Sequence, residues 1–105
     1  MKNIADIMKQ AQQLQSRVTD MQAELEAAQV EGRAGGGLVT ITMSGKGEVK
    51  KVSIDPSLMK ENEREIVEDL IVAAATDAKA KADALAAEKM KAVTGGLPLP
   101  PGLGL

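Results

Sequence analysis

Apolar residues in the first part of the chain recur at alternating spacings of three and four. Eight positions follow this heptad pattern without a break: Ile4, Ile7, Ala11, Leu14, Val18, Met21, Leu25 and Ala28. Most of the other positions are Gln, Lys, Asp or Glu, and no Gly or Pro occurs in residues 1–31. Such a seam predicts a long N-terminal helix that packs along one face against a partner helix.

The pattern changes from helical to extended in the middle of the chain. Four closely spaced glycines end the helical repeat: Gly32, Gly35, Gly36 and Gly37. Residues 29–34 are compatible with a short first strand. The segment that follows predicts a strand more clearly, because Val39, Ile41 and Met43 fall on one face and alternate with threonines.

A return strand is expected over residues 48–54. The turn before it, Gly45-Lys46-Gly47, contains glycines that allow positive φ. Val49 and Val52 are three residues apart and break the period of two, which indicates a β-bulge. A phosphate-binding loop is a weaker interpretation of these glycines, because no Ser or Thr follows Lys46 and the next element is a strand.

A second, Ala-rich helical pattern follows the stop at Asp55-Pro56-Ser57. Its buried side is expected to include Ile66, Ala74, Ala78 and Ala82. Gly95-Gly96 ends this helix, and residues 95–105 form a tail rich in Pro and Gly that we expect to be flexible. The tail contains four leucines, so it could also dock on a partner surface.

Together these elements predict an α+β fold in one domain over residues 1–94. The order is a long N-terminal helix, a small three-stranded antiparallel sheet that includes the hairpin 38–54, and a long C-terminal helix. Two long helices and a small sheet enclose only a thin core in a chain of 105 residues. We therefore expect the chain to complete its burial by self-association, as an obligate homodimer.

The side chains offer little chemistry. The chain has no His, no Cys and no aromatic residue, so the usual general acid–base and thiol catalysts are absent. A carboxylate metal site at Glu65, Glu68 and Asp69 is conceivable, but a solvated helix face explains these residues better. We expect no catalytic residue, no metal, no other cofactor and no small-molecule substrate.

The N-terminal sequence and the charge place limits on location and partners. Asp6 lies in a polar start that is unlike a signal peptide, and no apolar run approaches the ~20 residues of a membrane span. We expect a cytoplasmic protein without a membrane partner. The net charge of −2 alone argues against a nucleic-acid binder.

The charge is nevertheless segregated along the sequence. Residues 1–19 sum to +2, residues 20–32 to −4, residues 33–54 to +3, residues 55–69 to −4 and residues 70–105 to +1. Such blocks can produce a local attraction for phosphate that the total charge hides.

Three stretches resemble the YbaB/EbfC family of bacterial nucleoid-associated proteins. They are VEGRAGGGLVTITMSGKGEVKKVSIDPSL at 30–58, EDLIVAAATDAKAKA at 68–82 and TGGLPLPPGL at 94–103. The resemblance covers nearly the whole chain, and the segment 35–56 is its most specific part. It implies a sheet-mediated homodimer with protruding helical arms that binds double-stranded DNA in the nucleoid with weak sequence preference. It also implies a role in nucleoid organisation or gene regulation.

In that geometry the first helix runs toward the sheet and the second runs away from it. Residues 1–19 are then expected beside the end of the second helix, where they form basic arm tips together with Lys79, Lys81, Lys89 and Lys91. The acidic blocks 20–32 and 55–69 are expected together at the base of the arms. The expected DNA-binding residues are the basic side chains of the two helices: Lys2, Lys9, Arg17, Lys79, Lys81, Lys89 and Lys91. The hairpin lysines, Lys46, Lys50 and Lys51, are the next candidates.

Paired helices joined by a β-hairpin also describe a prefoldin-like subunit. In that alternative the chain is a coiled-coil protein-interaction or holdase module. Its helix tips, with Ile4, Ile7 and Met8 exposed, would hold non-native proteins.

Overall fold

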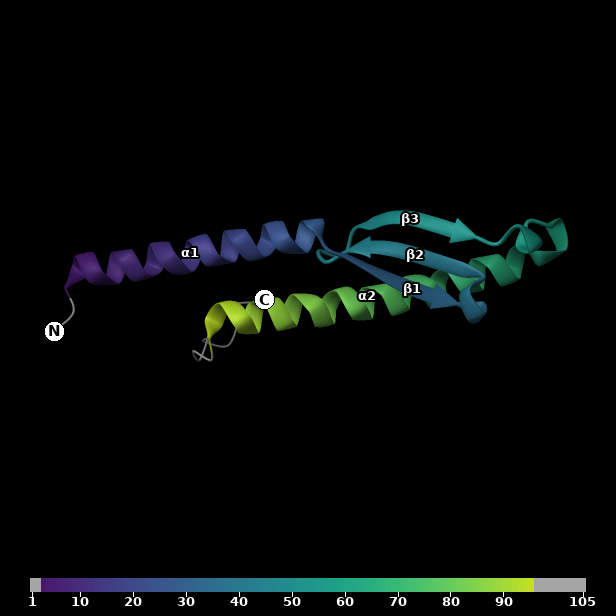
Figure 1. Cartoon of the computed structure of the whole chain (residues 1–105). Helices are drawn as coiled ribbons and strands as arrows, with labels where there is room; N and C mark the ends of the chain where they lie inside the picture. The colour runs from purple at the N-terminus through teal and green to yellow at the C-terminus, as the bar shows by residue number, and fades with distance from the viewer. Residues whose placement is uncertain (1–2, 96–105) are drawn as a thin grey trace.

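Two long helices and a three-stranded sheet are arranged along one axis of an elongated molecule (Figure 1). The computed structural model describes residues 3–95, and its extents are 71 × 24 × 16 Å. The main elements are α1 (Ile4–Ala27), β1 (Gln29–Ala34), β2 (Val39–Ser44), β3 (Val49–Ile54) and α2 (Arg64–Thr94). The predicted α+β order and the antiparallel sheet are confirmed. Residues 96–105 of the expected flexible tail lie outside the described residues.

Helix α1 ends at Ala27, although the stretch without Gly or Pro continues to residue 31. Asn3 caps its start by accepting a hydrogen bond from the Asp6 N–H at 2.9 Å. At its other end, the Gly45 N–H donates to the carbonyl oxygens of Leu25 at 2.9 Å and Ala28 at 3.1 Å. The hairpin turn therefore satisfies the last carbonyls of α1, and residues 29–34 leave the helix to pair with β2. The short first strand is confirmed.

The sheet has the order β1-β2-β3, with both pairings antiparallel. The inward side chains of the central strand, Val39, Ile41 and Met43, are buried to 4% exposure or less. Helix α2 packs on this face and covers β1 and β2. The apolar residues whose alternation predicted β2 therefore form the face of the sheet against which α2 packs.

The expected bulge lies in β3. Thr42 pairs with Lys51, whereas Met43 pairs with Val49, so Lys50 is the extra residue. The bulge restores the register and places Val49 and Val52 on the same face as Met43. Both valines remain about half exposed, at 55% and 45%, because α2 does not extend beneath β3.

Helix α2 begins after two short 3₁₀ turns, Pro56–Leu58 and Glu61–Glu63. Its three alanines on the sheet side, Ala74, Ala78 and Ala82, are at most 1% exposed, as expected. Ile66 was expected to be buried, but it is 49% exposed. Leu70 packs beside Gly35, just past the end of β1, and Ile66 lies about one helical turn further from the sheet.

Helix α2 approaches the sheet very closely at Gly32 of β1. A Cβ atom at this position would overlap the carbonyl oxygen of Ala74 and the backbone nitrogen of Ala78. Glycine is required here because the helix backbone occupies the space that any side chain would need.

We predict that Gly32→Ala destabilises the fold by about 1–3 kcal/mol, because the added methyl group must push the backbone of α2 away from β1. The matched control is Ser53→Ala, which changes an exposed position of β3. Urea unfolding followed by circular dichroism measures both variants. Equal stabilities of the two variants would contradict the close approach at Gly32.

Candidate nucleic-acid interface

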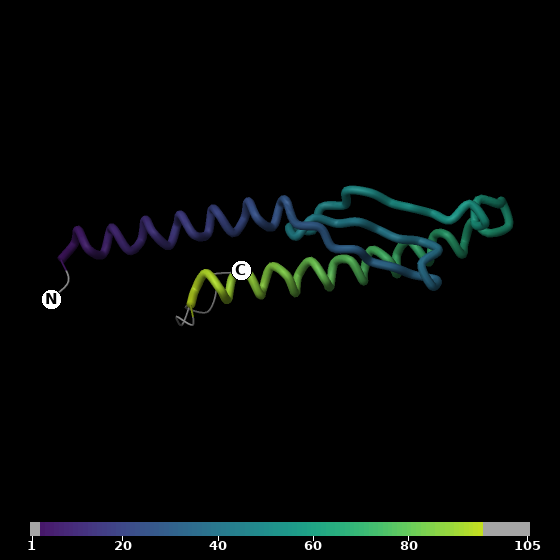
Figure 2. The backbone as a smooth tube through the Cα atoms, viewed as in Figure 1, coloured from purple at the N-terminus to yellow at the C-terminus, as the bar shows by residue number. Residues whose placement is uncertain are grey.

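The N-terminal half of α1 projects past the end of α2 (Figure 2). The last turn of α2, at Val93 and Thr94, forms a groove with α1 residues from Gln10 to Arg17. The end of α2 therefore lies beside the middle of α1, and residues 4–9 extend beyond it. The expectation that residues 1–19 lie beside the end of α2 is correct only for their second half.

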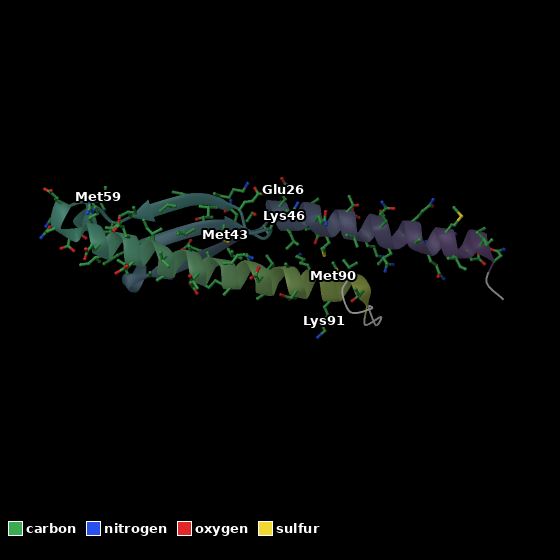
Figure 3. All side chains as sticks on the ribbon, turned by 180° about the vertical axis from the view of Figure 1, so that it is seen from behind. Glu26, Met43, Lys46, Met59, Met90 and Lys91 are labelled. Carbon is green, nitrogen blue, oxygen red and sulfur yellow. The ribbon has the colours of Figure 1, made fainter. Side chains whose placement is uncertain are left out.

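We call residues 4–19 of α1 the arm. Three of the expected DNA-binding residues lie in the arm or near it. Lys9 and Arg17 are exposed on α1, and Lys91 is exposed in the last turn of α2. Figure 3 shows Lys91 pointing away from α1. Within residues 3–95, none of these three side chains takes part in an ion pair. Lys2 lies outside the described residues.

Lys89 joins the two helices. Its Nζ lies 3.1 Å from Oε2 of Glu24 on α1. Both side chains are partly exposed, so this pair contributes little to stability and can rearrange. Lys89 is therefore at the junction of the arm with the sheet and not at the tip of the arm.

Lys79 and Lys81 lie beside the sheet, so their expected position in a basic arm tip is wrong. Lys79 pairs with Asp83 and lies next to the β2–β3 turn at Gly47. Lys81 donates to the carbonyl oxygen of Glu31 at 2.7 Å. Fifteen residues separate Lys79 from the end of α2, which is about 22 Å of helix.

Lys81 and Asp77 together bind the outer edge of β1. Asp77 Oδ2 lies 3.1 Å from Lys81 Nζ and accepts the Arg33 backbone N–H at 3.1 Å. The Arg33 N–H, and secondarily Lys81, lower the pKa of Asp77. Because Lys81 also binds the Glu31 carbonyl oxygen, α2 satisfies one acceptor and one donor of this edge, the Glu31 carbonyl and the Arg33 N–H. Helix α2 thus closes this edge of the sheet to a further strand.

The sequence contains only part of the signal for this clamp, which Asp77 and Lys81 form on β1. Asp77 and Lys81 have the i, i+4 spacing of a helical ion pair. The spacing alone does not reveal that both side chains also reach across to the backbone of β1.

The two acidic blocks lie at opposite ends of the sheet, so their expected meeting at the base of the arms is wrong. Residues 20–31 are at the junction of α1 with the sheet, whereas residues 55–69 form the far end of the molecule (Figure 1). Helix α1 and the start of α2 are separated by three antiparallel strands. The chain crosses the sheet once in each strand, so after three crossings it is at the end opposite to α1. The far end carries −4, whereas residues 4–19 of the arm carry +1 and residues 88–94 another +1.

The hairpin provides a second group of basic side chains. Lys50 pairs with Glu48 at 3.3 Å, and Arg33 on the open face of the sheet pairs with Glu31 at 2.7 Å. Lys46 lies in the turn, and Lys51 is exposed on β3. The hairpin therefore offers cations that are partly compensated by neighbouring carboxylates.

Residues 3–95 contain no group of three or more Asp or Glu side chains placed to hold a metal ion, and Glu65, Glu68 and Asp69 do not form one. Neither long helix in this part of the chain is apolar enough to cross a membrane.

The sequence matches the model of the YbaB/EbfC DNA-binding family over residues 1–97. A nucleoid-associated protein of Nitrobacter hamburgensis is 59% identical over all 105 residues, which cover 99% of that protein. One from Rhodopseudomonas palustris strain HaA2 is 61% identical with the same coverage. The crystal structure of an uncharacterized protein from Helicobacter pylori has the same fold, with a TM-score of 0.74 and 16% identity. That match covers 93% of this chain and all of the other.

We predict that Asp77→Asn lowers the melting temperature at pH 7 and that the difference from the wild type disappears in acid. A lowered folded-state pKa means that the ionised Asp77 contributes stability above the ordinary carboxyl pKa. This contribution is lost as the pH falls through the folded-state pKa, below about pH 4. Thermal unfolding of both proteins between pH 7 and pH 2 checks this. A difference that stays constant with pH would show that the charge of Asp77 is irrelevant.

Proposed function

Because this chain belongs to the YbaB/EbfC DNA-binding family, we propose that it binds double-stranded DNA as a homodimer, mainly through phosphate contacts and with weak sequence preference. Relatives that are about 60% identical are named nucleoid-associated proteins. We accordingly place the protein in the cytoplasm, on the nucleoid, with a non-catalytic role in nucleoid organisation or gene regulation.

The observation that carries this proposal is the projecting arm. Lys9 and Arg17 lie on a helix that stands clear of the acidic far end, so they can approach a phosphate backbone without bringing that end close to it. Lys91 adds a cation near the base of the projection. Two arms in a dimer double the number of contacts, which compensates for the small charge on each arm.

The composition favours duplex DNA over a single strand. Proteins that bind single strands stack bases on aromatic side chains, and this chain has none. Lysine and arginine on a helix surface suit the phosphates of a duplex, and such contacts carry little sequence information.

The surface we propose for dimerisation is the β3 side of the sheet. The edge of β1 is closed by Asp77 and Lys81, whereas β3 is the other edge strand. Val49 and Val52 are about half exposed there. A hollow beside them is lined by Met43 and by the flank of α2 from Ala75 to Asp83. An open edge with exposed apolar side chains favours association with a second copy.

The exposed apolar residues of the arm favour a second candidate, the holdase-like module. Ile4 is 75% exposed, and Ile7 and Met8 are each 56% exposed. This candidate predicts that the protein suppresses aggregation of an unfolded client and does not bind DNA.

We predict that Lys9→Glu/Arg17→Glu weakens duplex binding by at least about tenfold, because several phosphate contacts per dimer are lost. The control is Lys60→Glu/Arg64→Glu, which removes one Lys and one Arg at the acidic far end and changes the net charge equally. Fluorescence anisotropy with unrelated duplexes at several salt concentrations measures both. The arm variant should also show a shallower dependence of log K on log salt.

Equal weakening by the two variants would exclude the arm as the contact and leave only the overall charge. Absence of duplex binding by the wild type at low salt would refute the function itself. Weakening by the control alone would move the site to the far end.

We predict that Val52→Lys converts the dimer to a monomer, because it places a charge in the middle of the proposed interface. The control is Ile66→Lys. Ile66 lies eleven residues, or about three helical turns, before Asp77 and therefore on the β1 side of α2. Light scattering coupled to size exclusion gives both masses. A dimeric Val52→Lys variant, or a monomeric wild type, would contradict this interface.

A further inference from the structure

The apolar seam of α1 is covered at one end and exposed at the other. Met21 and Leu25, near the sheet, are each 5% exposed. Ile4, Ile7 and Leu14 belong to the same seam but are 75%, 56% and 38% exposed. Helix α2 is too short to cover the whole seam, so the N-terminal part of the seam stays exposed.

Helix α2 ends where the exposed part of the seam begins. Gly95 ends the helix in a left-handed conformation, with φ at 58° and its N–H bonded to the Lys91 carbonyl oxygen at 3.1 Å. The preceding residues, Val93 and Thr94, share a groove with Leu14. The chain after Gly95 therefore starts beside the exposed seam.

Residues 96–105 have a composition that suits this surface. They contain four leucines, three prolines and no charged residue. Ten residues reach up to about 33 Å when extended. The ten-residue step from Ile4 to Leu14 spans only about 15 Å of helix. Proline-rich segments bind along apolar grooves in an extended form at a small cost in entropy.

We propose that residues 96–105 pack along the α1 seam of the same chain, between Leu14 and Ile4. The leucines cover the part of the seam that lies beyond the end of α2, and the contact desolvates no charged side chain. Lys9 is two residues after Ile7, about 200° around the helix, so it stays exposed on the opposite side. The tail therefore covers the apolar side of the arm while its basic side remains accessible.

A second copy of α1 is the competing occupant. The exposed stretch from Ile4 to Leu14 is about one and a half heptads long. A sustained coiled coil needs about three to four heptads. The length of the stretch, and the start of the tail beside it, favour the tail.

The chain has no cysteine, so a single spin label can be introduced in the full-length protein. A nitroxide on Gly102→Cys should broaden the amide NMR signals of residues 4–14 and leave those of residues 55–69 unchanged. A mixed sample distinguishes the chains: a spin-labelled protein without ¹⁵N is combined with an unlabelled ¹⁵N protein. Broadening should be absent in that mixture.

Ile7→Ser, added to the spin-labelled protein, should restore most of the lost signal intensity in residues 4–14. The matched control, Ile66→Ser, changes a similarly exposed isoleucine on α2 and should restore none. Circular dichroism confirms that both variants are folded.

Three results would overturn the proposal. They are no broadening in residues 4–14, broadening that Ile7→Ser does not reduce, and broadening of residues 4–14 in the mixed sample as well. The last result would assign the contact to the partner chain. None of these readings requires DNA, so failure of the tail contact leaves the proposed DNA binding untouched.

Discussion

The backbone of α2 lies directly against Gly32 of β1, and this close contact organises the other elements of the fold. With no side chain between them, Ala74 and Ala78 reach the sheet and become fully buried. At this separation Asp77 and Lys81 can reach the backbone of β1. One glycine thus sets how closely α2 approaches the sheet and allows α2 to bind the edge of β1.

The same packing leaves apolar surface in two separate places. One is the β3 side of the sheet, which α2 does not cover, and the other is the projecting half of α1. Within residues 3–95 no further helix or strand is present to cover either place. We propose that a second copy covers the first surface and that the chain's own tail covers the second, so that the basic side of each arm remains available for DNA.

The sequence predicted the elements well because each depends on local signals. The alternation at Val39, Ile41 and Met43, and the three-residue step from Val49 to Val52, are properties of single strands, and both the strand and the bulge are confirmed. The charge map failed because it depends on the path of the chain. Lys79 and Lys81 look distal in the sequence. Because three strands place the start of α2 at the far end of the sheet, the part of α2 that contains these lysines lies beside the sheet, and only its last turns lie beside the arm. The Asp77 clamp could not be predicted either, because its partners are backbone atoms 44 residues away.

Contact between the arm and DNA can be observed by an NMR titration of the ¹⁵N-labelled protein with an unrelated duplex. If the arm binds the duplex, the amide signals of residues 4–19 and 88–94 shift progressively, while those of residues 55–69 do not. Shifts centred on Lys46, Lys50 and Lys51, with residues 4–19 unaffected, would place the contact on the hairpin and contradict binding by the arm.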